Sequence, residues 1–133
     1  MSKEYCNPLD LEYKFQHYGG NGHREAADPT IVLFKDTYYM FASMSAGFFY
    51  SEDLVNWKWH ENRNLDIYRY APDVRQIGDW LYFCASTRSI PSTIWRTKDP
   101  LSDEFEKVSE PFPFWDPDLF CDDDGRVYFY WGC

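Results

Sequence analysis

Two aspartates occupy the same position of a repeated pattern, and their carboxylates could act together on one substrate. A proline recurs three times along the chain, and the residues just before it are Asp28, Ala71 and Asp116. Two carboxylates that face one another across room for a water suit inverting hydrolysis of a glycosidic bond, because one activates the water and a carboxylic acid protonates the leaving oxygen. An aspartate before a proline also often caps a turn, so a structural role stays open for both residues.

The elements that would position these carboxylates follow from the repeat, whose prolines lie 43 and 45 residues apart. After each proline come two short apolar runs, separated by turn residues at 35–37, 78–79 and 122–125. Such pairs predict β-hairpins. A weaker repeat relates 48–57 to 93–100. Each unit therefore holds about four strands, which is the size of one β-propeller blade, and the residue before the proline would begin the innermost strand beside the central channel.

The fold class that we expect is all-β, a β-propeller of which this chain holds about two and a half four-stranded blades. Residues 1–27 are expected to form an irregular lead-in. Residues 28–133 would form a partial propeller catalytic domain with blades 1 and 2 and the first hairpin of blade 3. Since propellers have roughly four to eight blades, we expect a chain truncated at its C-terminus, inactive and poorly soluble as an isolated polypeptide. The alternative is a small β-sandwich of about eight to ten strands.

Composition narrows the classes of partner. There are 13 lysines and arginines against 22 aspartates and glutamates, so the formal net charge is −9, which argues against nucleic acid and membrane surfaces as partners. No apolar run approaches the ~20 residues of a membrane-spanning helix, and no secretion signal is visible. The 4 cysteines lack the paired spacing of a zinc site and predict reduced thiols. We therefore expect a cytoplasmic protein, provided that its native start does not lie upstream.

Four segments resemble, in order, motifs of glycoside hydrolase family 43. Residues 28–43 resemble its opening blade, and 51–57 its Ser-x-Asp-Leu-x-x-Trp strand. Residues 70–74 resemble its Trp-Ala-Pro-Asp-Val segment, with Tyr70 in place of the tryptophan, and 116–128 resemble its Asp-Pro-x-Leu-Phe-x-Asp-Asp-Asp-Gly stretch. The resemblance implies a five-bladed propeller that cleaves arabinofuranosyl or xylosyl linkages of plant-type polysaccharides or oligosaccharides with inversion.

The resemblance also implies roles for the two aspartates. Asp28 would be the general base that activates water, and Asp116 the second carboxylate, which modulates the pKa of the acid and orients it. The general acid of the family is a glutamate from a later blade, and no glutamate of this chain occupies a corresponding place. A non-catalytic carbohydrate-binding propeller and a protein-interaction propeller stay open as alternatives.

Substrate contacts are predicted at the ends of the repeats. Phe48, Tyr70 and Trp115 could stack on the apolar faces of sugar rings, although packing between blades is the other reading of such aromatics. Arg24 could bind a sugar hydroxyl or lie in a solvated charged turn. The acidic run at 122–125 lacks the glutamate that ends an EF-hand loop and predicts a hairpin turn instead. We expect neither a metal nor a cofactor.

Overall fold

In the computed structural model, the chain folds into antiparallel β-sheets. The described parts are residue 11, the backbones of 16–18 and 21–23, and residues 27–62, 64–65, 70–86 and 90–132. Within these parts, every regular element is a strand except the short 3-10 turn η2 (Pro100–Ser102). The predicted all-β class is therefore confirmed. The same residues contain no helix with the length and apolarity needed to cross a membrane.

The first predicted blade is a four-stranded antiparallel sheet whose strands follow one another in chain order. They are β3 (Thr30–Phe34), β4 (Thr37–Phe41), β5 (Gly47–Ser51) and β6 (Lys58–Glu61). The turn between β3 and β4 has positive φ at both central residues, Lys35 and Asp36. That backbone matches the twist of a two-residue hairpin, which explains why this turn joins neighbouring strands.

The second predicted blade repeats this arrangement, and a separate hairpin follows it. The sheet contains β7 (Tyr70–Ile77), β8 (Trp80–Ser86), β9 (Trp95–Thr97) and β10 (Glu106–Lys107) in chain order. The hairpin pairs β11 (Asp118–Cys121) with β12 (Val127–Tyr130). Positive φ at Gly78 and at Gly125 lies in the two hairpin turns that the sequence predicts.

The lead-in differs from the irregular segment that we expected. It contains a short hairpin in which β1 (Gln16–Tyr18) pairs antiparallel with β2 (Asn21–His23). These strands are polar and lack the β-branched residues by which a strand is usually recognised. Their backbone pairing, rather than strand propensity, makes them a sheet.

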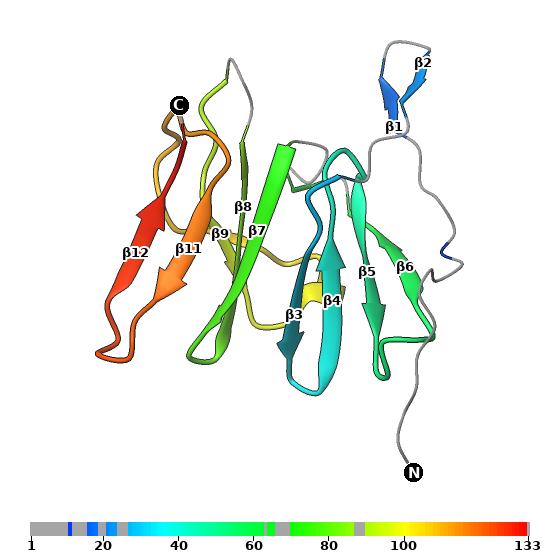
Figure 1. Cartoon of the computed structure of the whole chain (residues 1–133), viewed down its shortest axis with the longest axis horizontal. Helices are drawn as coiled ribbons and strands as arrows, with labels where there is room; N and C mark the ends of the chain where they lie inside the picture. Colours follow the sequence, from blue (N-terminus) through cyan, green and yellow to red (C-terminus); the bar gives the residue numbers. More distant parts are fainter. Residues whose placement is uncertain are drawn as a thin grey trace.

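The first strands of the three units lie side by side. Strand β7 contacts β3 on one side and β11 on the other. Figure 1 shows all three beginning at the upper edge of the molecule and running down to their hairpin turns. The residues that precede the three prolines therefore gather at this upper edge, which is the arrangement that blades of a propeller give to their inner strands.

The core lies between the two complete sheets. Phe34 and Phe41 of the first sheet and Leu81 and Phe83 of the second are at most 1% exposed and form one cluster. The rings of Phe41 and Phe83 meet across the two sheets with centroids 5.3 Å apart. A second cluster, which includes Leu119, packs the β11–β12 hairpin against the second sheet. Much of the aromatic content thus serves packing between blades.

Candidate active site

The residues before the three prolines share one unusual backbone conformation. Asp28, Ala71 and Asp116 have φ values of 50°, 48° and 42°. This left-handed region is uncommon for residues with a Cβ atom. Because alanine adopts it as well as the two aspartates, the repeat itself imposes the conformation. The side chain at each position then decides what chemistry that position offers.

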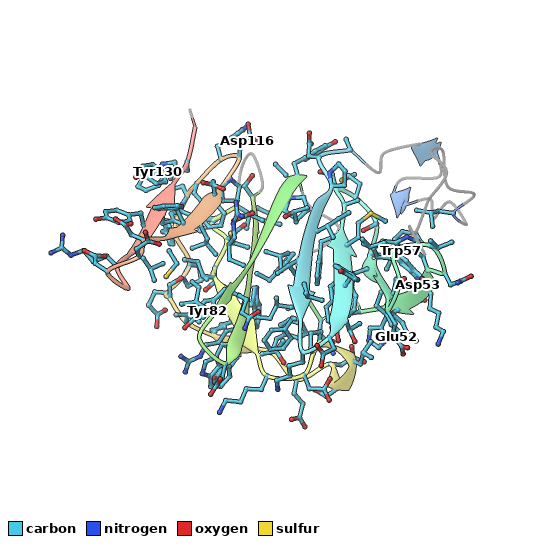
Figure 2. The ribbon with its side chains drawn as sticks, turned by 60° about the horizontal axis from the view of Figure 1, so that its bottom comes forward. Glu52, Asp53, Trp57, Tyr82, Asp116 and Tyr130 are labelled. Carbon is cyan, nitrogen blue, oxygen red and sulfur yellow. The ribbon has the colours of Figure 1, made fainter. Side chains whose placement is uncertain are left out.

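A cavity at the upper edge joins the candidate residues of different units. It has a volume of about 340 Å³ and is lined by Asp28, Tyr70, Ser86, Trp115 and Asp116. Both aspartates are exposed, and Figure 2 shows Asp116 at the edge where the inner strands begin. The structure therefore brings four of the predicted site residues together around one space, although the residues lie up to 88 positions apart in the chain.

Two buried serines connect the walls of this cavity. The Ser43 hydroxyl donates a hydrogen bond to the Asp28 carboxylate at 3.3 Å and accepts one from the Ala71 backbone N–H at 2.9 Å. Ser86 accepts from the Asp116 backbone N–H at 3.3 Å, and its hydroxyl lies 3.4 Å from the Tyr70 carbonyl. Each serine, which stands where the second strand of its unit ends, thus contacts the residue that begins the next unit.

Sequence reasoning missed these serines, although a signal was present. Each follows an alanine at the end of the second apolar run of its unit, so Ser43 and Ser86 occupy one column of the repeat. Gly132 occupies that column in the third unit and has no hydroxyl. A recurring polar residue at the end of an apolar strand was the feature that could have identified them.

One predicted substrate contact does not lie at the cavity. The prediction that Phe48 offers its face to a sugar is wrong, because the side chain is 0% exposed. Its ring packs between Phe41, with centroids 4.7 Å apart, and His60, at 4.9 Å. Strand β5 turns this residue into the core, where no ligand reaches it. Arg24 lies outside the described residues.

Three solved structures are similar to this chain. A bifunctional GH43-CE protein from Bacteroides eggerthii matches with a TM-score of 0.63 and 23% identity, over 81% of this chain and 18% of that chain. A thermostable family-43 glycoside hydrolase matches at 0.65 and 22%, over 95% and 44%. An α-L-arabinofuranosidase from Clostridium thermocellum matches at 0.60 and 18%, over 77% and 46%. The chain has the fold of part of a family-43 glycoside hydrolase.

The family-43 likeness is one of structure. Neither a protein-family model nor a curated protein matches the sequence. The chain spans less than half the length of the three solved structures. The shared fold nevertheless agrees with the blade architecture that the repeat predicts.

A buried carboxylate joins two of the inner strands. Asp73 of β7 is 6% exposed and accepts a hydrogen bond from the Leu119 backbone N–H of β11 at 2.7 Å. Arg75 lies 3.4 Å from Asp73 and donates to Asp118 at 2.9 Å. Burial raises the pKa of Asp73, although the Leu119 hydrogen bond and the Arg75 charge act in the opposite direction. This group joins the inner strands and lies outside the cavity lining.

A second cavity, of about 660 Å³, lies at the other end of the second sheet. Its lining includes Trp80, whose ring lies under the charged ends of Arg96 and Lys98 at 4.2 and 4.6 Å. These cations are held by aromatic packing, and Arg96 also pairs with Glu106 at 2.8 Å. Acidic and aromatic side chains line this cavity too. The smaller cavity is the better candidate site, because its two carboxylates come from equivalent positions of two repeat units, at the edge where the inner strands begin. Among the described residues, no group of three or more histidine, cysteine or acidic side chains could hold a metal ion.

Proposed function

We propose that this chain is part of a glycoside hydrolase of family 43 that hydrolyses arabinofuranosyl or xylosyl linkages with inversion. The observation that carries the proposal is the convergence of Asp28 and Asp116 on one cavity with Tyr70 and Trp115. Carboxylates supply the acid–base groups, and aromatic rings match the apolar faces of sugars. Similarity to an α-L-arabinofuranosidase structure supports arabinofuranosyl substrates among these classes.

In this proposal, Asp28 is the general base. Its carboxylate accepts a proton from a water as the water attacks the anomeric carbon, and the bond to the leaving oxygen breaks on the opposite face of the ring. Asp116 is the second carboxylate, which orients the acid and modulates its pKa. Tyr70 and Trp115 hold the sugar ring by stacking. The resemblance implies a glutamate from a later blade as the general acid.

The test uses the full-length protein with aryl α-L-arabinofuranosides and aryl β-xylosides. We expect hydrolysis, and proton NMR of the first product should show the anomer opposite to that of the substrate. Asp28→Ala and Asp28→Asn should each lower kcat by at least about a thousandfold, because the base is lost. Asp79→Ala changes an exposed aspartate in the β7–β8 turn and should retain wild-type activity. Retained activity in Asp28→Asn would overturn the base assignment.

A carbohydrate-binding role without catalysis is the second candidate. The observation that favours it is that no glutamate of the described residues lines the cavity, so the described part of the chain supplies no general acid of the expected type. Calorimetry with arabino- and xylo-oligosaccharides separates the two functions. Binding without any release of reducing sugar by the full-length protein would support this role, and turnover would exclude it.

A further inference from the structure

The Ser43 hydroxyl occupies the junction between the first two units. Its side chain is 0% exposed and its oxygen lies between Asp28 and Ala71. The Ser43 backbone N–H also donates to the Ala27 carbonyl at 2.9 Å. One residue therefore holds both the backbone that precedes Asp28 and the carboxylate of Asp28 itself.

The direction of these hydrogen bonds follows from which of the groups can donate a proton. The Ala71 N–H can only donate, so the Ser43 oxygen accepts from it. The single hydroxyl proton of Ser43 is then available to Asp28, whose ionised carboxylate can only accept. Because the Ala71 N–H holds the Ser43 oxygen on one side, the hydroxyl proton is directed at one carboxylate oxygen of Asp28, and this restricts how the carboxylate can turn.

The second unit provides an internal comparison. Ser86 holds the corresponding place and accepts from the Asp116 N–H, but position 71 is an alanine and offers no carboxylate to its hydroxyl. The hydroxyl of Ser86 faces the Tyr70 carbonyl instead. Both serines thus accept a hydrogen bond from the first backbone N–H of the next unit. Of the two, it is Ser43 that also donates to a carboxylate, and that carboxylate belongs to the proposed base.

We propose that Ser43 is a positioning residue that orients the Asp28 carboxylate toward the cavity. The inference rests on the proposed function for its kinetic consequence, because Ser43 acts through the proposed base rather than on the substrate. Its structural consequence, a single orientation of the Asp28 carboxylate, holds whether or not the protein is a hydrolase.

The first experiment observes that orientation directly. Crystal structures of the full-length protein and of its Ser43→Ala variant give the direction of the Asp28 side chain at the cavity. The wild type should show one conformer that keeps the Ser43 hydrogen bond, and Ser43→Ala should show a rotated or a divided conformer, because the donor that holds the carboxylate is lost. An Asp28 carboxylate that keeps its single wild-type conformer in Ser43→Ala would overturn the inference.

The matched control is Ser51→Ala. Ser51 is also buried, and its hydroxyl donates to the Asp53 carboxylate at 3.0 Å, in the turn between β5 and β6. This variant removes the same kind of hydrogen bond away from the cavity and should leave the Asp28 conformer unchanged. An equal change of the Asp28 conformer in Ser51→Ala would mean that general destabilisation explains the result, and the inference would fail.

Two further variants cover the case in which Ser43→Ala does not fold. Ser43→Cys fills nearly the same space with a weaker donor, so it should loosen the Asp28 carboxylate in the same way but to a smaller degree. Ser43→Thr keeps a hydroxyl and should retain the wild-type Asp28 conformer wherever the protein folds. A wild-type Asp28 conformer in Ser43→Cys would contradict the inference even without data on the alanine variant.

The kinetic experiment separates this inference from the proposed function. With an active wild type, Ser43→Ala should lower kcat about tenfold or more with little change in KM, and Ser43→Thr, which keeps the hydroxyl, should recover most of that loss. Loss of activity in Asp28→Asn together with an unchanged kcat in Ser43→Ala would retain the proposed function and overturn the role of Ser43. An inactive wild type whose Asp28 conformer changes in Ser43→Ala would retain the role of Ser43 and overturn the proposed function.

Discussion

The carboxylate of Asp73 and the backbone N–H of Leu119 join two inner strands across a hydrogen bond of 2.7 Å. The two residues lie 46 positions apart in the chain, in β7 and β11. Because Asp73 is 6% exposed, water cannot readily replace either partner. The contact therefore fixes the second unit to the third.

Removing this acceptor should destabilise the fold. We expect Asp73→Ala to lower the free energy of unfolding by about 1–3 kcal/mol, since the buried Leu119 N–H loses its partner. Asp73→Asn keeps an acceptor oxygen and should cost less. Urea unfolding of the full-length protein measures both. Asp118→Ala is the control, because it breaks only an exposed ion pair with Arg75, worth at most about 1 kcal/mol. Equal losses in the three variants would contradict the role assigned to the buried hydrogen bond.

The raised pKa of Asp73 predicts a sign for the pH dependence of stability. The folded state holds the Asp73 proton more tightly than the unfolded chain, whose aspartates titrate near pKa ~3.9. The contribution of this group is therefore fully present below that value and is lost as pH rises through the folded pKa. Unfolding of wild type and of Asp73→Asn is measured from about pH 3 to about pH 7, a range that contains the aspartate titration. As the pH rises, the unfolding free energy of the wild type should fall relative to that of Asp73→Asn. A change in the opposite direction would contradict the raised pKa.

The sequence predicts the blades well because their signals are local. The turns at 35–36, at Gly78 and at Gly125 fall where turn residues separate two apolar runs, and all have the positive φ that such turns need. Strand β10 is harder to predict, since Glu106 and Lys107 are both exposed and polar. Its place depends on pairing with β9, which no local pattern encodes.

In the candidate site too, the residues that a local pattern marks are located correctly from the sequence, and those that depend on distant contacts are not. Asp28 and Asp116 are found from the repeat, because equivalent positions in successive blades lie at one edge. Phe48 is misjudged because its burial depends on residues such as Phe41 and on how the neighbouring sheet covers β5. The role of Ser43 depends on a contact between two units. An alanine followed by a serine is too common a pair to predict such a contact from the sequence.

Gly47 should not tolerate a side chain. A Cβ atom at this position would lie 2.5 Å from the Trp59 ring and closer still to the His60 carbonyl oxygen, which is backbone and cannot rotate away. We expect Gly47→Ala to lower the free energy of unfolding by about 1–3 kcal/mol through overpacking between β5 and β6. Gly132→Ala is the control, because a Cβ there meets nothing within 4 Å. Thermal unfolding compares the two, and a stable Gly47→Ala would show that β6 can shift away.

The turn after β5 should show the opposite pH dependence to that of Asp73. The Asp53 carboxylate accepts hydrogen bonds from the Val55 and Asn56 backbone N–H groups at 2.9 and 2.7 Å and from the Asn56 side chain at 2.7 Å. Figure 2 shows Asp53 near the surface, beside Glu52. The hydrogen bonds from Asn56, followed by that from Val55, lower the pKa of Asp53 well below its usual range.

A lowered pKa means that Asp53 stabilises the fold in its charged form. Its contribution is present above the unfolded pKa of ~3.9 and is lost as pH falls through the folded value. Asp53→Ala should therefore unfold at a lower temperature than wild type at neutral pH, and the difference should shrink as the pH is taken below about 4. Exposed Glu52→Ala, which leaves the Asp53 hydrogen bonds intact, should keep the wild-type pH dependence. A gap between Asp53→Ala and wild type that stays constant down to the acid limit would mean that the turn needs the shape of the aspartate and not its charge.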